Sequence, residues 1–285
     1  MPNYKGGRMR RVFLWVTACS AILLFGQIYA GSLGGELSAD ENFGHTLTLF
    51  LHQLLLVYWL GPDIAVYIWS RRVVNTGLSV EQRIVAGNMM TMIDIVPRVC
   101  LSLFLTVAGI LSETYGLAHP WWQMIAIVLL GPVWLTIVLM SYLKRGSDFG
   151  DLVMRFDCWL RGLLVIGMPI SVIWSVSAGR LADSPWIAGK LIILAIVILL
   201  GLLLRLRLRA MFDGLNRMEK EGQTEAVDTV MATSLARAQL FSFAIWALLL
   251  WASLLGVVKP GEPASGEPVA RLEWLDPVRS LSSLQ

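Results

Sequence analysis

The feature of this sequence that most constrains its fold is a series of long apolar blocks. A helix needs about 20 apolar residues to cross the ~30 Å hydrocarbon core of a bilayer, and seven blocks meet that length. They cover residues 12–33, 43–70, 86–111, 120–143, 156–177, 185–204 and 238–258. Lipid offers no hydrogen-bond partner to an open backbone, so such blocks cross as helices. The sequence therefore predicts an all-α integral membrane protein with seven transmembrane helices.

Composition agrees with this class and argues against a nucleic-acid partner. Hydrophobic residues make up 56% of the 285 residues and charged residues only 15%, whereas a soluble domain carries about 25% charged residues. The net charge is +3, but most of the Lys and Arg residues lie in short segments between the blocks, where membrane topology explains them. The expected partner is the lipid bilayer.

The orientation follows from where the basic residues collect. They lie in the N-terminal segment and in the connections around residues 71–83, 144–155 and 205–220, whereas the connections between these are acidic or nearly neutral. Cytoplasmic loops are the basic ones. We therefore expect a bacterial inner-membrane protein with a cytoplasmic N-terminus and a periplasmic C-terminus. The apolar run in residues 12–33 is long for a signal-peptide core and is interpreted as an uncleaved span.

Residues 1–258 are thus predicted to form one helical bundle, in which residues 206–236 project into the cytoplasm as a polar helical hairpin. Residues 259–285 contain several Pro and Gly residues and predict an extended periplasmic tail. The six helices after the first read as three repeated hairpins. Two returning helices carry an Asp four residues before an Arg, and in the third Thr233 replaces the acid before Arg237.

Charged and amide side chains inside the blocks are the first candidate site. They are Asp63, Asn88, Asp94, Arg98, Asp157 and Arg161. An Asp and an Arg four residues apart share a helix face and can neutralise each other in lipid. Two interpretations stay open: a functional site, such as a proton relay, an anion pocket or a clamp for haem propionates, and an ion-pair network that fixes helix packing.

Three histidines form the second candidate site. His52 lies deep in the second block, where an imidazole is too short to reach water, so it needs a hydrogen bond, a metal ion or a cofactor inside the protein. His52 is the preferred ligand for a metal or for haem b, with His45 and His119 as an alternative pair and Arg98 as a further cofactor contact. Copper is the alternative to haem, although the nearby Met89, Met90 and Met92 do not share a helix face.

The segment from Leu51 to Gly61 carries a resemblance to a known family. Its pattern, His52 followed after six residues by Trp59, Leu60 and Gly61, resembles the copper-resistance protein D superfamily of bacterial inner-membrane proteins. That superfamily includes haem-containing membrane protoporphyrinogen oxidases. The resemblance covers mainly the second and third helices. It implies that His52 takes the role of the family's helix-two histidine and that Arg98 corresponds to its buried basic residue.

Three functions remain open on the sequence alone. The first, narrowly favoured, is a membrane protein that binds haem b or copper, with a redox role in which it exchanges electrons with quinone. The second is a transporter of a small solute or ion with Asp63, Asp94 and Arg98 along its path. The third is an accessory subunit that contacts other membrane subunits.

Overall fold

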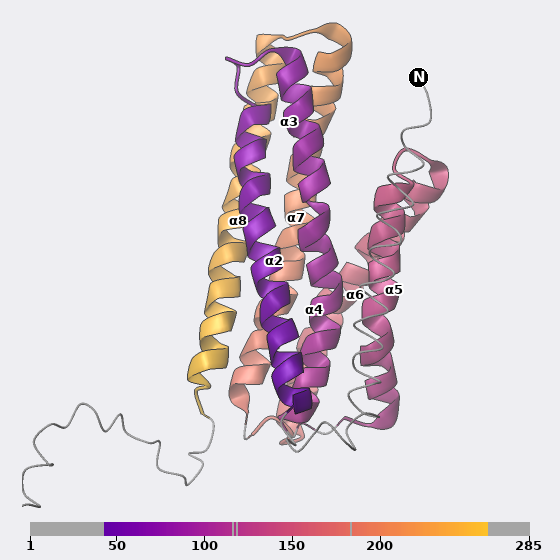
Figure 1. Cartoon of the computed structure of the whole chain (residues 1–285), viewed down its shortest axis with the longest axis vertical. Coiled ribbons are helices and arrows are strands. Elements are labelled where there is room, and N and C mark those ends of the chain that lie inside the picture. Colours follow the sequence, from indigo (N-terminus) through magenta and orange to yellow (C-terminus); the bar gives the residue numbers. More distant parts are fainter. Residues whose placement is uncertain (1–42, 116, 118, 183, 262–285) are drawn as a thin grey trace, which may run out of the picture.

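The computed structural model describes residues 43–115, 117, 119–182 and 184–261, and every regular element in this part of the chain is an α-helix (Figure 1). The helices are α2 (Phe43–Val73), α3 (Val80–Ile93), α4 (Ile95–Thr114), α5 (Trp121–Leu143), α6 (Asp148–Ser177), α7 (Pro185–Glu221) and α8 (Glu225–Val258). With α3 and α4 taken together, they make six helical stretches long and apolar enough to cross a membrane. The protein is therefore an all-α membrane protein, with six such spans in the described residues rather than seven. The predicted first span, 12–33, and the tail after residue 261 lie outside those residues.

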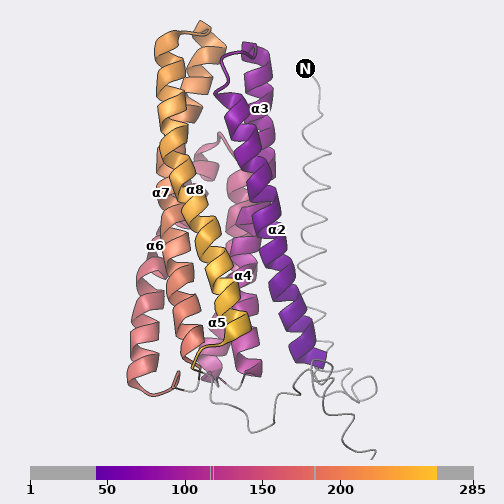
Figure 2. The ribbon, with the colours of Figure 1, turned by 90° about the vertical axis from the view of Figure 1, so that its left-hand side faces the viewer.

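The helices form an elongated bundle in which each one packs against the next in the chain. Contacts between α3 and α7 and between α2 and α8 bring the two ends of this series together. The turns α2–α3, α5–α6 and α7–α8 all point to the same end of the bundle (Figures 1 and 2). We call this the basic end, because these turns are flanked by most of the bundle's Lys and Arg residues. This grouping agrees with the alternation of charge in the sequence.

The third predicted span, 86–111, lies within one helical stretch, Val80–Thr114, with an irregularity at Asp94. Helix α3 ends at Ile93 and α4 begins at Ile95, but Asp94 between them keeps right-handed helical dihedrals and donates its N–H to the carbonyl of Met90. Pro97 explains the irregularity: it has no N–H to donate to the carbonyl of Ile93, and its ring crowds that carbonyl.

Helices α3, α6 and α8 begin earlier than their apolar blocks suggest, because their start signals are polar; Ser79 caps α3 by accepting a hydrogen bond from the N–H of Gln82. Helix α6 begins at Asp148, where the Ser147 side chain accepts a hydrogen bond from the N–H of Gly150 at 3.1 Å. Helix α8 begins at Glu225, where Thr224 caps the N–H of Val227 in the same way. Such caps satisfy backbone donors that have no partner in the first helical turn.

The helices at the basic end are longer than a bilayer requires. Helix α7 has 37 residues, which is ~55 Å at 1.5 Å per residue against a hydrocarbon core of ~30 Å. The predicted hairpin over 206–236 is therefore present, but it does not stand alone. It packs against the end of α2 and against α3 in a four-helix extension beyond the α5–α6 turn (Figure 2). The extension has its own apolar core of Val73, Ala86, Met90, Met211, Leu215, Met218, Met231 and Leu235.

A buried ion pair joins the two hairpins of the extension. The Arg83 side chain is fully buried, and its Nε donates a hydrogen bond to the carbonyl of Val73 at 2.7 Å. Its Nη1 lies 2.7 Å from Oδ1 of Asp228, although the two groups are not aligned as a hydrogen bond. Arg83 thereby connects α3 to both α2 and α8.

Candidate functional site

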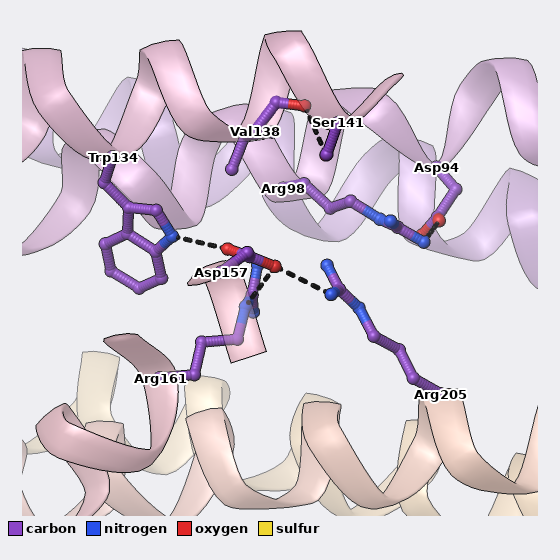
Figure 3. Close-up of polar contacts among 8 residues, drawn as sticks. All are labelled: Asp94, Arg98, Trp134, Val138, Ser141, Asp157, Arg161 and Arg205. Carbon is purple, nitrogen blue, oxygen red and sulfur yellow. Dashed lines mark hydrogen bonds and ion pairs between the residues drawn. The ribbon is translucent and has the colours of Figure 1, made fainter. Parts of the chain in front are cut away.

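Asp157 of α6 is the centre of a charge cluster inside the bundle (Figure 3). Its Oδ2 accepts a hydrogen bond from Nε of Arg161 at 3.0 Å and another from Nη1 of Arg205 at 2.7 Å. Its Oδ1 accepts one from the indole Nε1 of Trp134 at 2.9 Å. Asp157 and Arg161 are almost completely buried, and Trp134 has no exposed surface. Three helices, α5, α6 and α7, therefore satisfy one carboxylate.

The pair of Asp94 and Arg98 brings α4 into the same cluster. The guanidinium of Arg98 donates a hydrogen bond to Oδ2 of Asp94, as the four-residue spacing predicts. Arg205 reaches between the two carboxylates in Figure 3 and interacts electrostatically with Asp94 as well as with Asp157. The Asp94–Arg98 pair is more open than the pair on α6, with about a third of each side chain exposed.

Asp63 belongs to the neighbouring side of the bundle. Its carboxylate accepts a hydrogen bond of 2.6 Å from the indole Nε1 of Trp246, which joins α2 to α8, and it interacts electrostatically with Asp94. Asn88 lies elsewhere: it is exposed on α3 in the four-helix extension. Of the six polar residues singled out in the sequence, five therefore lie in or next to the cluster, and Asn88 does not.

The cluster contains more positive than negative groups around its centre. Arg98, Arg161 and Arg205 surround the carboxylates of Asp94 and Asp157. Nη2 of Arg161 is buried and has no hydrogen-bond partner. The Arg161 side chain is only 3% exposed, so little water reaches it. A buried guanidinium N–H without an acceptor is costly. The arrangement is therefore suited to accept an additional negative or polar group.

The three histidines lie away from the charge cluster, two of them on α2 and one just before α5. His45 of α2 forms a hydrogen bond of 2.8 Å with the Thr114 hydroxyl at the end of α4. Nδ1 of His119 lies 2.6 Å from a carboxylate oxygen of Glu113, which also accepts the backbone N–H of His119. Within the described residues, no three His, Cys, Asp or Glu side chains converge as they would around a metal ion.

His52 faces the bundle, as the sequence predicts. Its ring is half-buried and lies against the ring of Phe104 on α4, with 4.3 Å between ring centroids. Its Nδ1 is buried without a hydrogen-bond partner. The imidazole therefore has an unsatisfied nitrogen inside the protein, and one face of its ring is covered by Phe104. The methionines do not add to a metal site at His52, because Met90 is buried in the extension and Met89 and Met92 are exposed.

Three partners of the predicted polar residues were missed by the sequence analysis. Arg205 was assigned to the basic connection, although it lies ~30 Å along α7 from Pro185, at the edge of the hydrocarbon core. Trp134 and Trp246 were not singled out, because a tryptophan in an apolar block is ordinarily a packing residue. A buried indole N–H usually finds a hydrogen-bond partner, and this rule was the only available reason to expect polar contacts from them.

Comparison of the chain with protein-family models, with curated proteins and with solved structures gave no match. The resemblance of the His52 segment to the copper-resistance protein D superfamily therefore stays a prediction.

Proposed function

We propose that the protein transports a small solute or ion, and that the charge cluster around Asp157 is its binding site. The observation that carries this proposal is the charge cluster itself, in which three arginines meet Asp94 and Asp157 inside the bundle. Charged side chains within a membrane-spanning bundle commonly mark a solute or ion pathway. Asp94 lies where α3 meets α4, beside charged side chains from α6 and α7.

The burial of the cluster supports a role beyond helix packing. Charged side chains in a membrane are costly and ordinarily face a bundle interior or a water-filled path. A packing network needs only matched pairs, such as Asp157 with Arg161. This cluster adds Arg205 from another helix and leaves Nη2 of Arg161 without a hydrogen-bond partner, although the guanidinium lies over the Trp134 ring.

Flux into liposomes tests this proposal. The purified protein is reconstituted, and the movement of chloride, phosphate, acetate and protons is followed separately. We expect at least one flux above that of empty liposomes. Asp94→Asn should reduce this flux about tenfold, because a hydrogen bond to a charged group contributes ~1.5–3 kcal/mol.

Asp151→Asn is the matched control, since Asp151 is an exposed carboxylate on α6 outside the cluster. Its flux should equal that of the unchanged protein. Absence of flux for all four probes, or equal flux in the Asp94→Asn protein, would contradict the proposal.

A second candidate function rests on His52. We propose that its buried imidazole binds haem b or a copper ion, in a protein that exchanges electrons with quinone. The unsatisfied Nδ1 of His52 beside Phe104 supports this candidate. When bound, such a group would supply one-electron chemistry. The role of the protein would be to hold the haem or the copper ion in an apolar site between α2 and α4.

An absorption spectrum with metal analysis tests this second candidate. Protein purified from haem-replete, copper-supplemented cells should show a Soret band or bound copper. His52→Ala should abolish the signal, whereas His45→Ala should retain it, because His45 already has Thr114 as a partner. Colourless, metal-free protein would exclude this function.

A further inference from the structure

We propose that a groove between α7 and α8 binds the phosphate of an anionic phospholipid at the basic end of the bundle. The groove is a surface depression bordered by Leu206, Arg207, Ala210, Thr233, Ser234 and Arg237. Helices α7 and α8 run side by side there (Figure 1). This proposal does not depend on the transport function.

The charges along the groove lack an internal counterion. Of the described residues that line it, two are arginines and none is acidic. In the part of the chain that the structure describes, neither Arg207 nor Arg237 forms an ion pair. Two unpaired guanidinium groups on one depression fit a phosphate, which they can bind through paired N–H donors.

The repeated Asp-to-Arg spacing explains why Arg237 is available. In α4 and α6 the arginine pairs with an aspartate four residues earlier. In α8 that position is Thr233, which is exposed and lines the same groove. The hydroxyl can donate a hydrogen bond to a phosphate oxygen, whereas a carboxylate would occupy the arginine itself.

The depth of the groove points to a lipid. Residues 238–258 of α8 carry no charge and span ~31 Å at 1.5 Å per residue, which matches the hydrocarbon core. Arg237 therefore lies at the boundary of that core. Arg207 lies at the corresponding level of α7, a little over 30 Å from its start.

The apolar surface beside the groove fits acyl chains. Leu206 is 64% exposed and next to Arg207, and at this depth it faces lipid. A free phosphate ion would gain nothing from Leu206, whereas a phospholipid would place its chains against it. The lipid headgroup is therefore the occupant that accounts for both the charge and the apolar surface.

Native mass spectrometry of the delipidated protein tests this inference. The protein is titrated with phosphatidylglycerol or phosphatidylcholine, and bound lipid is counted. Phosphatidylglycerol should bind more tightly. The double substitution Arg207→Gln and Arg237→Gln should weaken it by about 30-fold, since each basic side chain near an anionic surface contributes on the order of fivefold.

The control double substitution is Arg209→Gln with Arg217→Gln, which removes the same charge from exposed positions of α7 outside the groove. It should leave the tight binding in place. Thr233→Asp should weaken it, because the new carboxylate would pair with Arg237 as in α4 and α6.

Three results would overturn the inference. They are equal loss in both double variants, equal affinity for the two lipids, and displacement of phosphatidylglycerol by inorganic phosphate at matching concentration. The last result would assign the groove to the free ion.

Discussion

At the scale of single residues, the same Asp-to-Arg spacing has different consequences in two helices. On α6, Asp157 and Arg161 are both at most 3% exposed, and Asp157 has two further donors, Arg205 and Trp134. On α4, Asp94 and Arg98 each keep about a third of their side chains exposed. The stability lost when one partner of an ion pair is removed depends on this burial, because a buried charge without its partner cannot be hydrated instead.

We therefore predict that Asp157→Ala destabilises the protein by ~3–5 kcal/mol, because it leaves Arg161 buried and unpaired. Asp94→Ala should cost less than this, because the long Arg98 side chain is about a third exposed near the edge of the hydrocarbon core and can extend toward the headgroup region. The measurement is unfolding in mixed detergent micelles. Equal costs for the two substitutions would contradict this account.

At the scale of helices, proline determines where the charge cluster can form. The prolines within α2, α5 and α6 leave those helices continuous, whereas Pro97 lies three residues after the irregularity at Asp94. Asp94 keeps helical dihedrals and donates its N–H to the carbonyl of Met90, and its carboxylate pairs with Arg98 one turn later.

Pro97→Ala should restore the hydrogen bond to the carbonyl of Ile93 and make α3 and α4 continuous. We expect this variant to keep or gain thermal stability and to lose most of the solute flux. Pro169→Ala in α6 is the control and should retain the flux. Full flux in the Pro97→Ala protein would show that the irregularity at Pro97 is not required.

Glycines decide how closely the helices of the extension approach. A Cβ at Gly214 of α7 would lie 2.5 Å from the buried Met231 side chain, whereas a Cβ at Gly201 of the same helix would meet nothing within 4 Å. Met231 has no exposed surface and cannot move aside without disturbing the core of the extension.

The two glycines should therefore respond to alanine with opposite signs. Gly201→Ala should stabilise the protein by up to ~1 kcal/mol through helix propensity, whereas Gly214→Ala should destabilise it by ~1–3 kcal/mol through overpacking. Thermal unfolding of the two variants measures the difference, and stabilisation by both would contradict the packing described for Met231.

At the scale of the whole molecule, the bundle has two unlike ends. The basic end carries the turns α2–α3, α5–α6 and α7–α8 and extends beyond the bilayer as a four-helix unit with its own core. At the opposite end, Lys259 lies over the rings of Tyr115 and Trp186, where aromatic side chains commonly meet the membrane surface.

Single cysteines placed in a cysteine-free background should report this arrangement. Asn75→Cys, Ser147→Cys and Gln223→Cys lie in the three turns of the basic end and should all react with a membrane-impermeant maleimide from one side. We expect that side to be the cytoplasm. Ala178→Cys, after α6, should react only from the other side. Labelling of the three turns from different sides would contradict the fold.

The sequence by itself determined the class of protein, the approximate spans and the pairing of Asp94 with Arg98. These features depend on local properties: the length of apolar blocks, the sign of nearby charges and the four-residue period of a helix. The hairpin over 206–236 was also evident, because its polar residues follow an apolar block with no proline and a single glycine, Gly214, before Gly222.

Only the tertiary structure decided which polar side chains meet. Arg205 belongs with Asp157, 48 residues away, and Trp246 with Asp63, 183 residues away. The four-helix extension likewise needs α2 and α3 beside α7 and α8. Helix packing sets these contacts, and packing depends on the fit of many side chains at once. No local pattern around one residue records its distant partner, so the charge cluster emerges only from the folded bundle.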